Sequence, residues 1–180
     1  MKYYIGIDLG GTNVRVAKIN EEGKIIQDIK RPSKAKEGPE VVLANIKEMI
    51  NEIDNYAECK GIGVGVPGPV DTYSGVMTMS TNLPGFTGYP IAKELEDAFN
   101  LPTFLDNDAN AATLGEYIFG AGQGCENMIY ITASTGVGGG AILNGKLYRG
   151  STSNALEIGH STVHPKGRPC GCGNCGCVES

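Results

Sequence analysis

Apolar and polar residues alternate through the first part of the chain. Three stretches show this alternation, with short polar turns between them, and they read YYIGIDLG, NVRVAKIN and KIIQDIK within residues 3–31. A period of two is typical of strands with one buried face, so the pattern predicts a meander of three strands. The short apolar run GIGVGVP at residues 61–67 predicts a buried parallel strand.

Apolar residues at helical spacing follow in three places, which are residues 39–54, 91–100 and 109–119. Residues 102–105 have the pattern of a strand between the last two of these helices. Residues 69–89 are expected to form a loop or a small insertion. The order of three strands, helix, strand, helix, strand and helix predicts an α/β fold.

A second group of strands is predicted near the end of the chain, with a strand at residues 128–133, a glycine-rich turn at 134–140 and further strand pattern at 141–148. The N-terminal part of the chain has the same order of apolar strand, glycine-rich turn and apolar strand. We therefore expect two lobes built on one plan, an N-terminal lobe at 1–119 and the beginning of a second lobe at 120–180. The alternative is two unrelated hairpins with glycine turns.

The composition narrows the class of protein. With 180 residues, of which 41% are hydrophobic, the chain can bury a core, which excludes a disordered protein. The net charge of -5 without a basic stripe disfavours a nucleic-acid binder. No apolar run approaches the ~20 residues that span a bilayer, so no membrane association is expected. The N-terminus enters a strand pattern without a signal peptide, which predicts the cytoplasm.

Two glycine-rich loops are candidates for binding phosphate. Asp8-Leu9-Gly10-Gly11-Thr12 ends one predicted strand and begins the next, so its backbone N–H groups can approach an anion without a Cβ in the way. The second loop, at residues 134–140, offers the same chemistry. The presence of two such loops favours a protein that holds a nucleotide between two lobes. Asp8 would then lie near the phosphates and the metal ion that accompanies the nucleotide. The alternative is that each is an ordinary hairpin turn in a protein that binds nothing.

A polar cluster, Asp106-Asn107-Asp108-Ala109-Asn110, lies where a predicted strand ends and a helix begins. Ligands of α/β sheets bind at this edge. One carboxylate here can accept a proton from an attacking hydroxyl, as phosphoryl transfer to an alcohol requires. The alternative is that Asp106 or Asn107 only caps the helix.

Four of the six cysteines fall within the last eleven residues of the chain. Because the chain has no export signal, metal binding is a better interpretation than disulfides. His160 with Cys170, Cys172 and Cys177 supplies one nitrogen and three sulfurs, a set suited to a closed, structural zinc site. Cys175 is an extra thiol that we expect to be a spectator, although it can compete as a ligand or oxidise.

The remaining thiols and the second histidine carry no signal of this kind. Cys59 and Cys125 are expected to be buried small apolar residues. His164 has no set of cysteines at a suitable spacing of its own. We therefore assign no chemistry to these three residues.

Six short motifs follow one another along the chain. They are DLGGT at 8–12, GVPGPVD at 65–71, DNDANAA at 106–112, STGVGGG at 134–140, EIGH at 157–160 and CGCGNCGCVE at 170–179. Together these motifs resemble the ROK group of bacterial sugar kinases and sugar-responsive repressors, within the actin, hexokinase and Hsp70 superfamily, and the resemblance spans the whole chain. It implies an actin/hexokinase-like (ribonuclease H-like) α/β fold, with a complete-looking N-terminal lobe and the start of a second.

The resemblance implies roles for residues at matching positions. It makes Asp108 the catalytic base for a sugar hydroxyl and implies ATP with Mg²⁺ as cofactors, together with structural Zn²⁺. The implied sugar contacts are Gly68 through its backbone, Asn82, Asn107, Asp108, Glu157, His160 and Glu179. The implied contacts to the ATP phosphates are Asp8, Gly10, Gly11, Thr12, Thr135 and Gly136. The implied zinc ligands are His160, Cys170, Cys172 and Cys177. For Asn82 and Glu179 the alternative is an exposed loop residue.

The chain departs from the family pattern in two respects. Before EIGH the family is rich in small residues, with glycine directly before the glutamate, whereas this chain has Ser153 and Leu156. Leu156 can crowd the loop that carries Glu157. Family members also continue well past the cysteine cluster, so we expect either that the chain is truncated or that a partner chain completes it. Family members commonly form dimers or tetramers.

Three functions follow as hypotheses. The first is ATP-dependent phosphorylation of a hexose, such as glucose, at O6, with little or no activity expected of the isolated 180-residue chain. The second is a sugar-binding transcriptional regulator, which in this family carries an N-terminal DNA-binding domain, whereas here a strand begins at Lys2. The third is an inactive fragment. The preferred sugar is left open.

Overall fold

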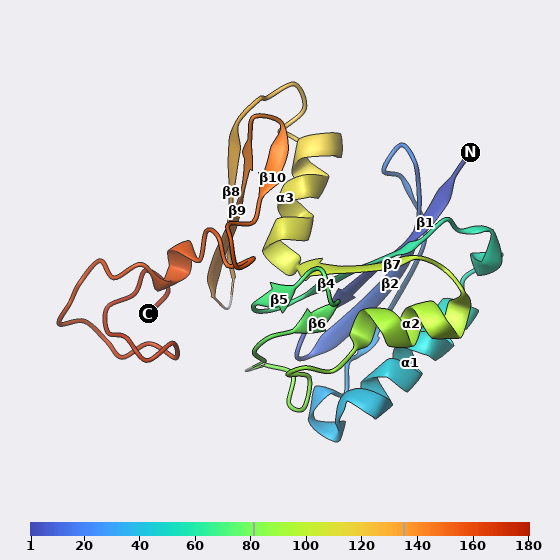
Figure 1. Ribbon diagram of the computed structural model, residues 1–180, viewed down its shortest axis with the longest axis horizontal. Coiled ribbons are helices and arrows are strands. Elements are labelled where there is room, and N and C mark those ends of the chain that lie inside the picture. The colour runs from blue at the N-terminus through green and yellow to red at the C-terminus, as the bar shows by residue number, and fades with distance from the viewer. Residues whose placement is uncertain (81, 135) are drawn as a thin grey trace. The chain divides into compact units, whose positions relative to one another are not determined.

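The computed structural model describes residues 1–80, 82–134 and 136–180. Two compact units divide the chain, Met1–Asp108 and Ala109–Ser180. Figure 1 shows the elements of each unit.

The first unit is built on a five-stranded sheet with the order β3-β2-β1-β4-β7. The chain enters it through an antiparallel meander, and β4 and β7 then add parallel to β1. All the strands predicted for this part of the chain are confirmed. The five strands are β1 (Tyr3–Leu9), β2 (Asn13–Asn20), β3 (Ile25–Pro32), β4 (Ile62–Val66) and β7 (Thr103–Asn107).

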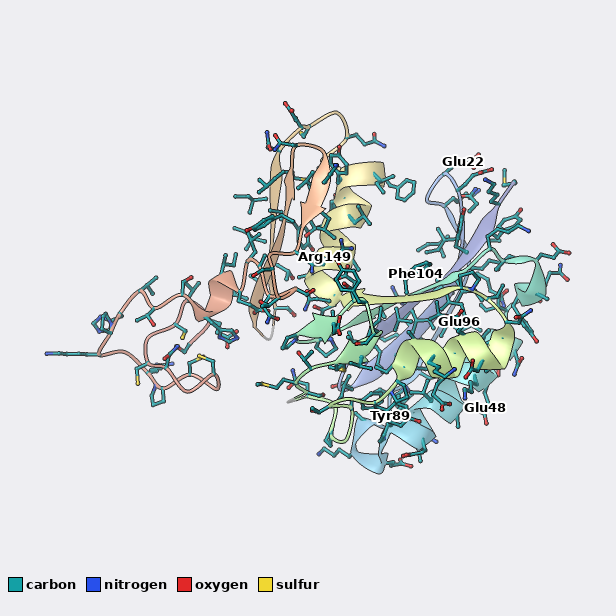
Figure 2. All side chains as sticks on the ribbon, viewed as in Figure 1. Glu22, Glu48, Tyr89, Glu96, Phe104 and Arg149 are labelled. Atoms are coloured by element: carbon teal, nitrogen blue, oxygen red, sulfur yellow. The ribbon has the colours of Figure 1, made fainter. Side chains whose placement is uncertain are left out.

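Two helices, α1 (Pro39–Asn51) and α2 (Ile91–Phe99), cover one face of this sheet. Their exposed sides carry Glu48 and Glu96, as Figure 2 shows, so that their apolar sides remain for the sheet. The predicted helices in this unit are confirmed. Short 3-10 helices, η1 (Ala35–Glu37) and η2 (Tyr56–Glu58), flank α1.

Alternation along the strands assigns each side chain to one face. The side chains that face the helices, such as Ile7, Val16 and Val64, are almost fully buried. Their sequence neighbours Asp8 and Arg15 lie on the other face and are exposed. This opposite face therefore carries the polar groups at the carboxyl end of β1.

The segment expected to be a loop or a small insertion, residues 69–89, contains a small two-stranded sheet made of β5 (Val70–Asp71) and β6 (Val76–Met77). Leu83 and Phe86 from the same segment are completely buried in the core of the first unit. This insertion is therefore tied to the sheet through its apolar side chains rather than through long strands.

The second unit contains α3 (Asp108–Phe119), apart from its first residue, and a three-stranded antiparallel sheet with the order β10-β9-β8. The strands are β8 (Met128–Ala133), β9 (Val137–Leu143) and β10 (Lys146–Tyr148). Asn144 and Gly145 join β9 to β10 with φ of 51° and 72°, values typical of a type I′ turn. The division between the two units falls after the first residue of α3, whereas the predicted lobe boundary lies after that helix.

Three glycines expected in a turn, Gly138, Gly139 and Gly140, lie inside strand β9 instead. A Cβ on Gly140 would come within 2.2 Å of the Thr113 hydroxyl of α3, and one on Gly139 within 3.0 Å of Ile158. The glycines are therefore needed because β9 packs very closely against its neighbours. The same close packing explains why α3 groups with this sheet.

Residues 149–180 contain only a short 3-10 helix, η3 (Ile158–His160), and isolated bridges between Thr162 and Cys177 and between Pro169 and Cys175. Backbone hydrogen bonds fold the end of this segment back on itself, including Cys170 N to Asn174 O at 2.7 Å. Among the described residues, no helix has the length and apolar character to cross a membrane.

Candidate functional site

The glycine turn between β1 and β2 is held on both sides. The Gly10 N–H donates to Asn13 O at 2.9 Å, and Thr12 O accepts from Ser33 N–H at 2.9 Å. A Cβ on Gly11 would lie 2.9 Å from the backbone oxygen of Asn82. Glycine is thus required at position 11 by the close approach of the loop that carries Asn82.

An open, polar pocket of about 410 Å³ surrounds this turn. It contains all four residues of the turn that were predicted to contact phosphate. Three further residues that line it, Asn13, Arg15 and Lys30, were not predicted from the sequence. The lining residues are Asp8, Gly10, Gly11, Thr12, Asn13, Arg15 and Lys30.

The predicted sugar contacts in the first unit fall into two groups. Asn82 lies against the glycine turn through the contact with Gly11. Gly68 O accepts a hydrogen bond from Asn107 Nδ2 at 3.2 Å, which ties the loop after β4 to the end of β7. Gly68 has a φ of 94°, a conformation that L residues rarely adopt.

Asp108, the predicted base, is exposed and is the first residue of α3. It directly follows Asn107, so the strand-to-helix junction carries both groups. Asp106 lies opposite Gly65 of β4, which is in turn opposite Asp8 of β1. The sheet therefore presents Asp8 and Asp106 in one row on the same face.

In the second unit, Glu179 links two of the predicted contact regions. One carboxylate oxygen, Oε2, accepts from the Val137 N–H at 3.4 Å and would lie 3.0 Å from a Cβ on Gly136. The other, Oε1, lies 3.4 Å from His160 Nδ1. Glu179 is thus half-buried rather than an exposed loop residue. Thr135, predicted beside Gly136, lies outside the described residues.

Glu157 is exposed at the start of η3, and its carbonyl oxygen accepts from the His160 N–H at 3.1 Å. Leu156, immediately before it, has a φ of 60°, and Ser153 has a φ of 59°. Left-handed backbone is costly for a leucine and free for glycine. The departure from the family pattern therefore places strain directly beside Glu157.

His160, Cys170, Cys172 and Cys177 form a compact group in which the four potential ligand atoms lie within 4.8 Å of one another. The Sγ atoms of Cys172 and Cys177 are 3.7 Å apart, and Cys170 Sγ is 3.6 Å from His160 Nδ1. Ligands about 2.3 Å from a common tetrahedral centre lie roughly 3.8 Å from one another. The spacing of these atoms therefore fits one tetrahedral zinc ion.

Without a cation beside it, the thiol of Cys177 resists ionisation. Burial, together with the neighbouring Cys172 and Cys170 thiols, raises the pKa of Cys177 to about 12. A thiolate at this position therefore needs a positive charge beside it, and zinc deprotonates the thiols that it binds. Four protein ligands would leave no open position for a water, as in structural zinc sites.

The other cysteines lie apart from this group. Cys175 is exposed and is not one of the four clustered ligands, and Cys59 is buried as expected. The prediction that Cys125 is buried is wrong, because it lies exposed in the turn after α3. Its N–H donates to Gly122 O at 3.1 Å, and the turn runs along the surface of the second unit.

The variant Gly159→Ala, which adds one methyl group to η3, tests how tightly this helix packs. The Cβ of Gly159→Ala would lie 1.9 Å from Val137 O, so we expect the variant to lose about 2–3 kcal/mol of stability and part of its zinc affinity. Thermal unfolding and zinc titration measure both. The matched control is Gly115→Ala on α3, whose Cβ meets nothing within 4 Å and which lies away from the cysteine cluster. Equal stability of the two variants would contradict the close contact.

Comparisons with known proteins establish the family and the fold of the chain. The family model described as "ROK family" matches residues 4–180. A glucokinase of Thermotoga maritima is 39% identical over 98% of this chain and 56% of its own length. A ROK family glucokinase from Streptomyces griseus, solved in complex with glucose and AMPPNP, has a TM-score of 0.88 and 37% identity over 98% of this chain and 56% of its own.

The chain belongs to the ROK family, and its fold is that of the ROK hexokinase structures, an actin-like α/β fold. The family also contains regulators, since a xylose repressor of Caldicellulosiruptor bescii is 35% identical over 98% of this chain and 45% of its own length. The chain spans about half the length of the curated relatives that it matches.

Proposed function

We propose that this chain supplies the donor-phosphate and sugar-binding residues of a hexose kinase that uses ATP. The observation that carries the proposal lies within the first unit. There the glycine turn predicted to bind phosphate is in direct contact, at Gly11, with the loop that carries Asn82. The phosphoryl donor and the sugar that accepts the phosphoryl group would therefore bind next to each other. The similarity to glucokinases supports the same chemistry at the level of the family.

In the proposed reaction, Asp108 accepts the proton of a sugar hydroxyl, taken as the O6 hydroxyl of glucose or a related hexose. The oxygen then forms a bond to the γ-phosphorus of ATP, the bond to the β-phosphate oxygen breaks, and ADP leaves. Asn82 and Asn107 would orient the sugar, with the backbone of Gly68 beside it. The exposed position of Asp108 at a helix start is compatible with access to a substrate.

The donor would be bound by Asp8, Gly10, Gly11 and Thr12 in the first unit, with Thr135 and Gly136 assigned to it in the second. Backbone N–H groups and the Thr12 hydroxyl can donate to phosphate oxygens. Mg²⁺ would be held near Asp8 and would neutralise charge on the phosphates.

In the second unit, Glu157, His160 and Glu179 are proposed as further sugar contacts. The zinc ion would fix the ring of His160 through Nδ1, the atom next to Cys170 Sγ. Its role is structural: it would order the segment that carries these three residues. We also propose that the full-length protein forms an assembly of two or more copies.

A panel of sugars tests the function. The full-length gene product, with Mg²⁺ and ATP, should release ADP in the presence of at least one of glucose, fructose, mannose and N-acetylmannosamine, and not in their absence. The repressor among the relatives makes a sugar sensor the second candidate. Saturable sugar binding without ADP release would favour the sensor and contradict the kinase.

A further inference from the structure

One face of the first sheet carries a row of three charged side chains, of which only Asp8 belongs to a family motif. Asp8 on β1 is the direct cross-strand partner of Arg15 on β2, and Arg15 is the partner of Lys30 on β3. Directly opposed residues point to the same face, so the three side chains are neighbours on the face away from α1 and α2. All three line the pocket at the glycine turn.

The placement of Lys30 opposite Arg15 is unfavourable for the sheet alone, since like charges directly across an antiparallel pair repel. Arg15 forms an ion pair with Asp28, whose Oδ1 lies 3.3 Å from Arg15 Nε, and it lies opposite Asp8 in the strand register. Lys30 takes part in none of the ion pairs among residues 1–80, 82–134 and 136–180. The exposed ammonium group of Lys30 can therefore interact with a negatively charged ligand in the pocket.

We propose that Lys30, supported by Arg15, binds the phosphate chain of the phosphoryl donor in this pocket. The glycine turn offers N–H donors at one side, and Lys30 offers a mobile positive charge at the other. The ligand chemistry is a linear triphosphate, which occurs in a nucleoside triphosphate and in inorganic polyphosphate. The inference rests on the proposed function and deepens it.

The alternative is that Lys30 only protects the sheet edge, because β3 is an edge strand and lysines there discourage pairing with other chains. That role needs neither the pocket nor Arg15 as a neighbour. It would change the aggregation of a variant without changing its affinity for phosphate.

The test measures binding of Mg·ATP and of magnesium tripolyphosphate to the full-length protein by calorimetry. Lys30→Gln should weaken both ligands about 10-fold, as expected for the loss of one charged contact. The loss should shrink as potassium chloride is added. Lys30→Arg should restore affinity, and Lys24→Gln, on the turn between β2 and β3, should bind like the wild type. The melting temperature of Lys30→Gln should not fall, because a like-charge pair is removed.

Each other result counts against the inference in a distinct way. If the wild type binds neither ligand, the proposed function and the inference are both overturned. If the wild type binds and Lys30→Gln binds equally well, only the inference is overturned. A loss for ATP without a loss for tripolyphosphate also overturns it, because Lys30 would then recognise the nucleoside rather than the phosphate chain.

Discussion

Asp108→Asn should reduce phosphoryl transfer by the full-length protein about 10²- to 10⁴-fold while leaving sugar binding nearly intact. An amide of the same shape can still hydrogen-bond a hydroxyl, but it cannot accept its proton. Steady-state kinetics with a coupled ADP assay measures kcat, and calorimetry measures sugar affinity. The loss is therefore expected in kcat rather than in the binding constant.

The matched control is Asp97→Asn on α2, where the carboxylate is exposed and pairs with Lys93 at 2.9 Å. It makes the same chemical change away from the glycine turn and the strand-to-helix junction. We expect it to keep wild-type kcat. If Asp108→Asn keeps more than about a tenth of the activity, a different group must accept the proton.

Cys177→Ser should abolish stoichiometric zinc binding and unfold the end of the chain. Cys177 is the most buried of the four clustered ligands, with 3% of its surface exposed, and a serine hydroxyl is a poor substitute for a thiolate. Apparent binding energies of structural zinc are roughly 10–16 kcal/mol, so the loss of the ion removes a dominant stabilising term from this segment. Metal analysis and hydrogen exchange of residues 157–180 measure the effect.

Cys175→Ser is the control for this variant, because Cys175 is exposed and lies outside the four-residue group. It should retain one zinc per chain and wild-type protection. Zinc retained in Cys177→Ser, or lost equally in both variants, would contradict the assigned ligand set. A weaker sugar affinity in Cys177→Ser should accompany the loss of zinc, because His160 and Glu179 lie in the same segment.

The regular elements were predictable because their hydrophobic periods are clear. The meander at residues 3–31 and the helix beginning at Pro39 occur where the pattern placed them. The sheet formed by β5 and β6 was not foreseen, because strands of two residues have no period to detect.

The glycines of β9 show a different limit of sequence reasoning. A run such as Gly138-Gly139-Gly140 is typical of a turn, but here it allows close packing against Thr113 and Ile158. Those partners are distant in the sequence, so only the folded chain shows why side chains are excluded. Cys125 was misplaced for a related reason, because its small apolar character does not reveal a surface turn.

The candidate site was predictable where the chemistry depends on spacing within one segment. The spacing of the cysteines at 170, 172 and 177 with His160 predicted a cluster of potential metal ligands, and the structure brings all four together. Arg15 and Lys30 were missed because their signal lies in strand register. Pairing about the glycine turn places Arg15 opposite Asp8, and the next strand then places Lys30 opposite Arg15. Register of this kind follows from the hairpin geometry once the turn is located.

The central claim is that the protein transfers the γ-phosphoryl group of ATP to a hexose, and isotope transfer tests it most directly. The full-length protein should be incubated with Mg²⁺, glucose and ATP labelled at the γ-phosphate, and with mannose and N-acetylmannosamine in parallel. We expect label in a sugar phosphate in equal amount to the ADP formed, and none with Asp108→Asn on the same timescale. Sugar binding without labelled sugar phosphate, or label released only as inorganic phosphate, would contradict it.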